Sequence, residues 1–229
     1  MASADGRLFI VGTPIGNMED ITLRALRVLR EADLIAAEDT RRTGVLLARH
    51  GLNKPMVSYH EFNEARRTPE LLRELQQGRR IALVSDAGMP AISDPGQRLL
   101  RAAFQAEIAV EVIPGVSALT TALVASGCAI EDGVLFYGFL PHKSGQRRTA
   151  LSRLASQPQT LVFFESPHRL LKTLRDMREL LGNRGVVVAR ELTKKFEEFV
   201  RGDIDSVLKK LENRAIKGEI TLVVDGRQA

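Results

Sequence analysis

The sequence predicts an α/β protein with two domains. Along all 229 residues, short apolar runs that suit buried strands alternate with amphipathic runs that suit helices. The alternation is most regular in the first half, so we expect the sheet of that half to be mainly parallel. The pattern changes near Pro114, where a Pro-Gly pair ends an apolar run. We therefore expect one α/β domain over residues 1–115 and a second over residues 116–229.

The first half is expected to hold five strands, at residues 7–11, 34–37, 56–58, 81–85 and 110–113. Asp20 is expected to cap a helix that carries Leu23 on its apolar face. Thr68-Pro69 is expected to open another helix, because proline is favoured at the first helical position. Further helices are expected at 43–50, where Gly51 ends the run, and at 96–105.

The second half is expected to open with a helix of small residues at 118–126, introduced by Ser117. A polar loop at 141–148 follows the first strand of this half. The remaining apolar runs predict strands at 134–137, 160–164, 186–189, 197–201 and 219–224, and helices at 168–181 and 204–213.

The composition limits the classes of function. The net charge of +5 suits a polyanionic partner, although an excess of this size is equally typical of a solvated surface. Aromatic residues make up only 5% of the chain, which argues against a binder that relies on stacking platforms. Cys128 is the single cysteine and the four histidines are scattered, so we expect no disulfide and no metal site.

No targeting or membrane segment is expected. The N-terminus lacks the cationic start and long apolar core of a signal peptide. Residues 112–130 carry no charge and approach the length of a membrane span, but they include Pro114, Gly115 and Gly127. This stretch therefore predicts a strand, a loop and a helix, and we expect a soluble cytoplasmic protein.

Five polar or glycine-containing segments each follow an expected strand. They are GTPIGN at 12–17, EDTRRT at 38–43, SDAGMPAISDPG at 85–96, FFESPHR at 163–169 and ARELTKK at 189–195. Because open α/β sheets bind ligands at the carboxyl ends of their strands, these segments predict an enzyme site there. Each also has a purely structural interpretation as a turn, a helix cap or a self-paired charged surface.

The residue types in these segments indicate their chemistry. Glycines at 12, 16 and 88 allow a ligand to approach the backbone closely. The first segment is neither a phosphate-binding P-loop nor a dinucleotide fingerprint. Asp86 would accept hydrogen bonds from ligand hydroxyls or an amine, and Arg41 with Arg42 suits phosphate contacts. Periodicity and residue type alone do not identify the cofactor.

Nine motifs in order resemble the tetrapyrrole (corrin/porphyrin) methylase superfamily, and within it the branch that methylates small-subunit ribosomal RNA. The motifs, which span residues 9–224, are FIVGTPIGNMEDITLRALRVL, AAEDTRRT, SYHEFNE, LVSDAGMPAISDPG, IPGVSALTTAL, FYGFLP, FFESPHRL, VARELTKKFEE and GEITLVV. The resemblance implies two α/β domains of the tetrapyrrole-methylase type, with S-adenosyl-L-methionine in the cleft between them and no metal. It also implies a homodimer and, as substrate, the 2′-oxygen of a cytidine in small-subunit (16S) ribosomal RNA.

The resemblance also assigns residues. Those implied around the cofactor are Pro14, Asp86, Gly88, Ile92, Ser117, Ala118, Phe164 and Thr221. For the reaction and its RNA we expect Glu38, Arg41, Arg42 and Lys194, with Lys195 in the same basic rim. The candidates for a general base are Glu38, Asp39, Glu165, His168 and Glu191. We favour Glu38, because it adjoins two arginines able to hold the flanking phosphates.

Two departures from the family pattern affect these expectations. Related chains usually continue into a C-terminal helical extension, whereas this sequence stops soon after TLVVDG. The family usually has threonine where Met89 stands. The alternative functions are C-methylation of a tetrapyrrole precursor, whose carboxylates would also suit a basic protein, and non-catalytic binding of nucleic acid.

Overall fold

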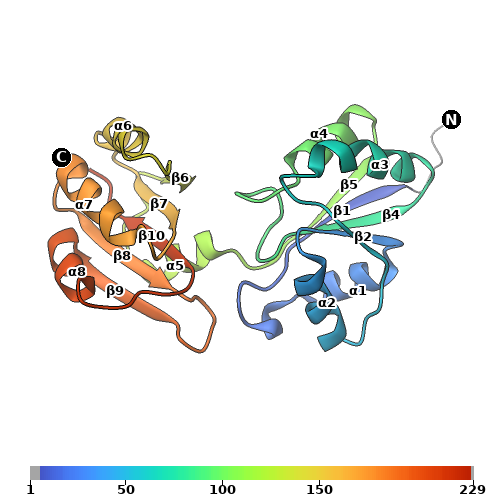
Figure 1. Cartoon of the computed structure of the whole chain (residues 1–229), viewed down its shortest axis with the longest axis horizontal. Coiled ribbons are helices and arrows are strands. Elements are labelled where there is room, and N and C mark those ends of the chain that lie inside the picture. The colour runs from blue at the N-terminus through green and yellow to red at the C-terminus, as the bar shows by residue number, and fades with distance from the viewer. Residues whose placement is uncertain (1–5, 228–229) are drawn as a thin grey trace. The chain divides into compact units, whose positions relative to one another are not determined.

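A computed structural model describes residues 6–227 of the chain. It divides into two compact units, Met1–Ser117 and Ala118–Ala229, so the change of unit falls two residues after the expected domain boundary. Each unit contains one sheet and its own helices (Figure 1). The predicted α/β class is confirmed.

The first unit is a five-stranded parallel sheet. Its strands are β1 (Arg7–Val11), β2 (Leu34–Ala37), β3 (Met56–Ser58), β4 (Arg80–Val84) and β5 (Ala109–Ile113), in the order β3-β2-β4-β1-β5. Every pairing between neighbours is parallel, as predicted for this half. The strands are nearly continuous apolar runs because both faces of such a sheet are covered by helices.

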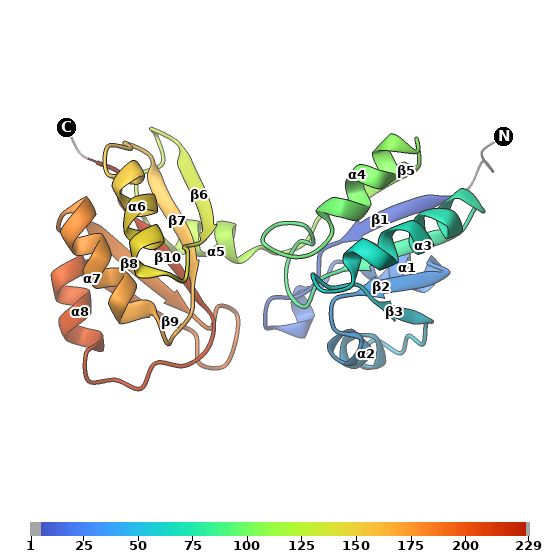
Figure 2. The ribbon, with the colours of Figure 1, turned by 45° about the horizontal axis from the view of Figure 1, so that its top comes forward.

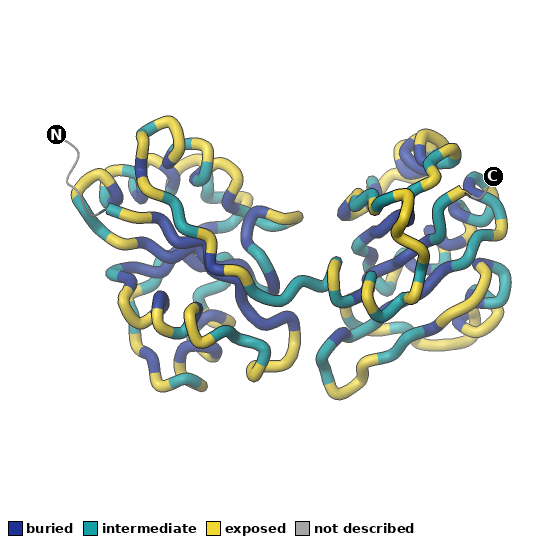
Figure 3. Tube along the Cα trace, turned by 180° about the vertical axis from the view of Figure 1, so that it is seen from behind, coloured by how far each residue is buried: buried dark blue, intermediate teal, exposed yellow. Residues whose placement is uncertain are grey.

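Two pairs of helices cover the faces of this sheet (Figure 1). The helices are α1 (Leu23–Glu31), α2 (Thr40–Arg49), α3 (Glu64–Gln76) and α4 (Gln97–Gln105), with a 3-10 turn at Met18–Asp20. Leu29 of α1 and Leu47 of α2 pack with one face, and Leu75 of α3 and Leu99 of α4 with the other. The sheet therefore lies between two apolar cores, and the central strands are the most deeply buried segments (Figure 3).

The second unit has a mixed sheet in the order β6-β7-β10-β8-β9. Its strands are β6 (Val134–Phe139), β7 (Thr160–Glu165), β8 (Gly185–Arg190), β9 (Glu198–Asp203) and β10 (Ile220–Val224). Only β6 and β7 run parallel, and β10 is antiparallel to both of its neighbours. Helices α6 (Ser144–Leu154), α7 (Leu170–Leu181) and α8 (Ile204–Leu211) enclose a single core on one face (Figure 2). Helix α5 (Ala118–Ser126) packs against β10 and β8.

Two helix starts were predicted wrongly in the first unit. Asp20 ends the 3-10 turn, and Thr22 caps α1 instead, since its side-chain oxygen accepts the N–H of Ala25 at 3.0 Å. Leu23 is consequently 86% exposed rather than part of the apolar face. Pro69 lies inside α3, which begins at Glu64.

Two further boundaries differ. Helix α2 begins at Thr40, three residues earlier than expected, because Asp39 caps it through the N–H of Arg41. Helix α6 begins at Ser144, which shortens the expected polar loop at 141–148. The uncharged stretch at 112–130 forms the end of β5, a loop and α5, as predicted. Within residues 6–227, no helix has the length and apolar character needed to span a membrane.

Candidate functional site

Four of the loops that carry the predicted site leave one edge of the first sheet. They follow β1, β2, β4 and β5, which are parallel neighbours in the order β2-β4-β1-β5. Parallel strands end at the same edge, so the sequence-distant segments at 12–17, 38–39, 85–96 and 114–117 start side by side. This is the edge at which open α/β sheets bind ligands.

The loops after β1 and β4 are tied together by Thr13 and Gly88. The backbone N–H of Thr13 donates to the carbonyl of Gly88 at 2.9 Å, and the N–H of Gly88 donates to the carbonyl of Thr13 at 3.0 Å. The hydroxyl of Thr13 also donates to the carbonyl of Ser85 at 3.2 Å. Thr13 was not among the predicted residues, although its place directly after a buried strand could have suggested it.

Two glycines bring a third loop against these. A Cβ on Gly12 would lie 2.7 Å from the backbone nitrogen of Gly115 and 2.7 Å from the sulfur of Met89, so neither neighbour leaves room for a side chain. Gly88 has a φ of +77°, and a Cβ there would lie 3.7 Å from the carbonyl oxygen of Val116. Glycine is thus required at 12 by close packing and at 88 by backbone conformation.

The rest of the 85–96 loop has a fixed and unusual shape. Ala91 and Ser93 have φ values of +66° and +63°, where residues with side chains are uncommon. The side chain of Gln97 donates to the carbonyl of Ala91 at 3.0 Å and so holds the turn. Ile92 is 44% exposed at the loop tip, while Pro14 is buried.

Acidic side chains link the loops after β2 and β4. The carboxylate of Glu38 accepts the N–H of Asp86 at 3.1 Å, and the carboxylate of Asp86 accepts the N–H of Asp39 at 3.0 Å. This reciprocal pair brings the predicted catalytic and cofactor segments together. Burial, together with the charges of Asp86 and Glu61, raises the pKa of Glu38 in spite of its backbone hydrogen bond and Arg42.

The two arginines of this segment are already paired. Arg41 contacts the Asp39 carboxylate through its side chain at 2.7 and 3.0 Å, and these hydrogen bonds hold the pKa of Asp39 well below its usual range. Arg42 lies 3.4 Å from the carboxylate of Asp86. Both guanidinium groups stay mostly exposed, so a phosphate would have to share them with these acids.

The predicted residues of the second unit fall into separate groups. Phe164 on β7 is directly opposite Thr221 on β10, so the structure brings these two together. Phe164 also contacts the rings of Phe136 and Phe139, with centroids 5.0 and 5.6 Å apart. Ala118 is the first residue of α5, which packs against β10.

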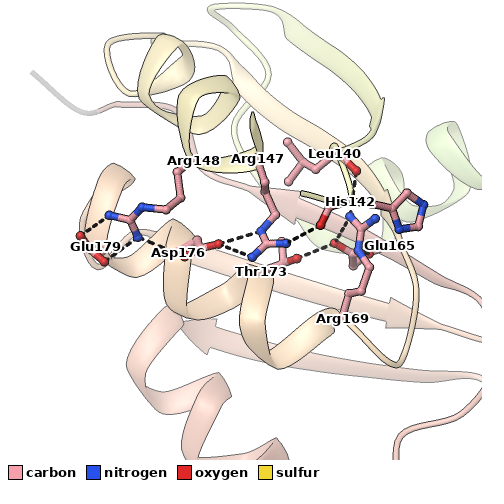
Figure 4. A network of polar contacts seen from close by, with 9 residues as sticks. All are labelled: Leu140, His142, Arg147, Arg148, Glu165, Arg169, Thr173, Asp176 and Glu179. Atoms are coloured by element: carbon pink, nitrogen blue, oxygen red, sulfur yellow. Dashed lines mark hydrogen bonds and ion pairs between the residues drawn. The ribbon is translucent and has the colours of Figure 1, made fainter. Parts of the chain in front are cut away.

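Glu165 is a structural residue of the second unit and an unsuitable general base. Its carboxylate is 1% exposed and accepts the hydroxyl of Thr173 at 2.6 Å and the N–H of Ser166 at 2.7 Å. It also pairs with Arg169, whose side chain donates to the carbonyl of Leu140 at 2.8 Å (Figure 4). The candidacy of Glu165 as a base is therefore corrected, because the oxygens that would take a proton are buried and engaged.

A second buried pair lies in the same unit. Arg147 contacts Asp176 at 2.6 Å, with side chains that are only 7% and 13% exposed. Arg148 bonds to Asp176 and to the exposed Glu179 (Figure 4). The sequence shows no sign of the network around Glu165, because Glu165 ends β7, Arg169 precedes α7 and Thr173 lies in its first turn, so no single periodicity connects them.

Lys194 and Glu191 also form an internal group. The ammonium of Lys194 lies 2.9 Å from Glu191 and 3.0 Å from Glu219. Burial disfavours its charged form, but the two carboxylates outweigh burial and raise the pKa of Lys194. Glu191 also accepts the N–H of Glu219 at 2.9 Å. His168 and Lys195 are exposed, and among residues 6–227 no three His, Cys, Asp or Glu side chains are grouped as metal ligands.

The comparisons with known proteins settle the family. The model of the family described as Tetrapyrrole (Corrin/Porphyrin) Methylases matches residues 7–208. The chain belongs to the tetrapyrrole methylase family. The glycine-containing loops of this methylase lie at the carboxyl ends of parallel strands, and they include residues that the sequence resemblance assigned to the cofactor.

Individual relatives agree with this assignment. A Thermotoga maritima protein named Ribosomal RNA small subunit methyltransferase I is 49% identical over 97% of this methylase and 100% of its own length. The protein of that name from Halalkalibacterium halodurans is 52% identical over 96% of this chain and 76% of its own. Among solved structures, the methyltransferase CobJ has a TM-score of 0.72 at 18% identity, covering 98% of this chain and 97% of its own. The likeness to CobJ is one of fold.

Proposed function

We propose that the protein is an S-adenosylmethionine-dependent methyltransferase that methylates the 2′-oxygen of a cytidine ribose in small-subunit ribosomal RNA. The observation that carries the proposal is 49–52% identity, over nearly the whole chain, to relatives named ribosomal RNA small subunit methyltransferase I. Cobalt precorrin-4 methyltransferase, which has the same fold, is only 19% identical. That contrast favours RNA over a tetrapyrrole as the substrate.

The loops of the first unit suit the cofactor. Gly88 leaves bare backbone at a positive φ, and the quarter-exposed Asp86 carboxylate has lone pairs for hydroxyl or amine donors. When bound, the cofactor supplies a methyl carbon that its sulfonium has made electrophilic. From the family resemblance, the residues we propose for binding this ligand are Pro14, Asp86, Gly88, Ile92, Ser117, Ala118, Phe164 and Thr221.

The chain's own residues would orient the RNA and accept a proton. Holding the 2′-oxygen in line with the sulfur–methyl bond lowers the activation free energy by roughly 7–11 kcal/mol. Glu38 is the proposed base for the hydroxyl proton, because its raised pKa brings it nearer to neutral pH than an ordinary glutamate. Arg41, Arg42, Lys194 and Lys195 are the proposed basic rim for the phosphates.

The test uses the purified protein with labelled S-adenosylmethionine. Small ribosomal subunits, naked small-subunit RNA and uroporphyrinogen are offered separately. We expect label in RNA. The methyl group should lie on a ribose 2′-oxygen, so the phosphodiester bond that follows this nucleotide should resist alkaline cleavage. Label in the tetrapyrrole would favour the other branch of the family, and label in neither would favour a binding protein without catalysis.

We also propose that the protein acts in the cytoplasm as a homodimer. The proposed ribosomal RNA substrate supports the cytoplasm, and the resemblance to the family supports the dimer. Light scattering at micromolar concentration tests the assembly. A mass close to that of one chain, 25.3 kDa, would refute the dimer.

A further inference from the structure

A small cavity outside the site described above lies at the end of β8 and the start of β9. It has a volume of about 250 Å³ and is closed by the segment between α8 and β10. We call it the Phe196 pocket, after the ring that lines it, and its charged lining residues are Arg190, Glu191, Glu198, Arg214 and Lys217. Of these, only Glu191 is among the candidate general bases, and none is a proposed cofactor residue.

The Phe196 pocket combines an apolar part with a charged part. Val188, Val200 and Leu211 line it and belong to the buried core of the second unit. Phe196 is 66% exposed, so a large part of its ring faces solvent. An exposed ring above an apolar floor suits a flat ligand that can stack.

The charges of the pocket favour an anionic ligand. Two carboxylates line the pocket, and both are paired with cations. Glu191 is 2.9 Å from Lys194, and Glu198 is held by Arg190 at 3.1 Å and by Arg214 at 2.7 and 2.9 Å. Lys217 also lines the pocket and adds a further cation. Its backbone carbonyl accepts a hydrogen bond from the side chain of Arg190. The ammonium of Lys195 lies 5.7 Å from the centre of the Phe196 ring. A group stacked on that ring would therefore have cations within reach of an attached phosphate.

The volume of the Phe196 pocket limits which flat ligands can enter it. Typical small-molecule sites measure about 300–1,000 Å³. A cavity of about 250 Å³ accepts one planar base and is too small for a tetrapyrrole. Unpaired bases of single-stranded RNA are commonly recognised by stacking on aromatic rings, with basic side chains on the neighbouring phosphates.

We propose that the Phe196 pocket binds one unpaired nucleotide of the RNA substrate. The base stacks on Phe196, and Lys195 and Lys217 contact its phosphates. The inference rests on the proposed RNA methyltransferase function and adds a specificity subsite to it.

The experiment compares Phe196→Ala with Phe104→Ala. Phe104 is a matched control, because it is 64% exposed and lies on α4 of the other unit. Binding of a single-stranded fragment of small-subunit RNA is measured by fluorescence anisotropy. We expect Phe196→Ala to weaken binding about five- to one-hundred-fold, as loss of one base–aromatic stack does, and Phe104→Ala to match wild type.

Three further readouts separate a binding role from a structural one. Phe196→Ala should raise the KM for RNA while leaving kcat and the affinity for S-adenosylmethionine unchanged, and Phe196→Trp should restore binding. Lys217→Gln should reduce the slope of log affinity against log salt by about 0.7.

Equal affinities of Phe196→Ala and Phe104→Ala for naked RNA would overturn the proposal. A defect confined to assembled subunits would also overturn it, because the contact would then be with a ribosomal protein. Since binding needs no turnover, these outcomes stay readable if wild-type protein fails to methylate RNA, which is the failure of the proposed function itself.

Discussion

The Glu38 carboxylate lies partly buried at the end of β2 and accepts the N–H of Asp86. A general base works in its deprotonated form, so the methylation rate should fall as pH drops through the pKa of Glu38. Because burial raises that pKa, the loss should begin at a higher pH than an ordinary glutamate would give. Glu38→Gln, which keeps an oxygen for Asp86, should lower kcat about 10²–10⁴-fold and abolish the acid limb.

Single-turnover methyl transfer measured across pH checks this prediction. Glu61→Gln is the matched control, because Glu61 is an exposed acid whose charge also acts on Glu38. A Glu38→Gln variant that retains the acid limb would assign the base to another residue.

Arg41 provides a second test at the residue scale. Its guanidinium is 89% exposed and bound to Asp39, so Arg41→Ala should leave the free energy of unfolding close to that of wild type. If Arg41 contacts a phosphate, the same variant should flatten the dependence of log affinity on log salt by about 0.7. Titration with an RNA fragment at several salt concentrations measures the slope. An unchanged slope would mean that Arg41 contacts no phosphate and only forms a surface ion pair with Asp39.

At the scale of elements, two glycines of the first unit should respond in opposite directions. Gly12→Ala places a Cβ 2.7 Å from the Gly115 nitrogen, and overpacking of this kind costs about 1–3 kcal/mol. Gly44 lies in α2, where an added Cβ meets only Met56 at 3.6 Å. Gly44→Ala should therefore stabilise the helix by about 0.5–1 kcal/mol.

Denaturant unfolding of both glycine variants provides the measurement. Calorimetry with S-adenosylmethionine should also show weaker binding for Gly12→Ala and unaltered binding for Gly44→Ala. Equal stability of the two variants would argue against the tight contact between the loops after β1 and β5.

The contact between α6 and α7 includes a buried ion pair. Asp176→Ala would leave the buried guanidinium of Arg147 without its carboxylate, and breaking such a pair costs about 3–5 kcal/mol. Glu179→Gln removes the other partner of Arg148, but at an exposed position, so it should hardly change stability. Thermal unfolding of the two variants compares them directly, and similar losses would contradict the assigned burial.

The elements were predictable from sequence to the extent that local patterns determine them. The run at Arg7–Val11 gave β1 without error, because five consecutive strand residues precede a glycine. Pro69 misled the prediction of α3, because the helix begins before the proline, at Glu64. Thr68 bonds to the Glu64 carbonyl within the helix at 2.7 Å and to the buried Tyr59 hydroxyl outside it at 2.9 Å. The contact with Tyr59 leaves no periodic signal.

The segments that form the candidate site were predictable from the sequence, but the contacts between their side chains were less so. The carboxyl ends of four parallel strands converge as the alternation of elements required. The sequence placed Glu165 beside His168 as a possible base, but only the fold reveals that Thr173 and Arg169 occupy its oxygens. The partners of Lys194 come from Glu191, three residues away, and from Glu219 on another segment.

At the scale of the whole molecule, stability is divided between separate cores. Two clusters of buried side chains cover the faces of the first sheet, and a third cluster belongs wholly to the second unit. No described residue is shared between the cluster of the second unit and the other two. We therefore expect each unit to open as its own cooperative structure.

Leu174→Ala tests this division. Leu174 is fully buried on α7 in the core of the second unit, so its truncation should cost about 2–5 kcal/mol there. Amide hydrogen exchange should then lose protection in β7, β8 and β10, while β1 and β4 keep wild-type protection. Leu99→Ala, a truncation at an equally buried position on α4, should give the reverse pattern. Equal loss of protection in both units from either variant would mean that the two units unfold together. A core defect in one unit can lower protection in strands of the other only if both belong to a single cooperative structure.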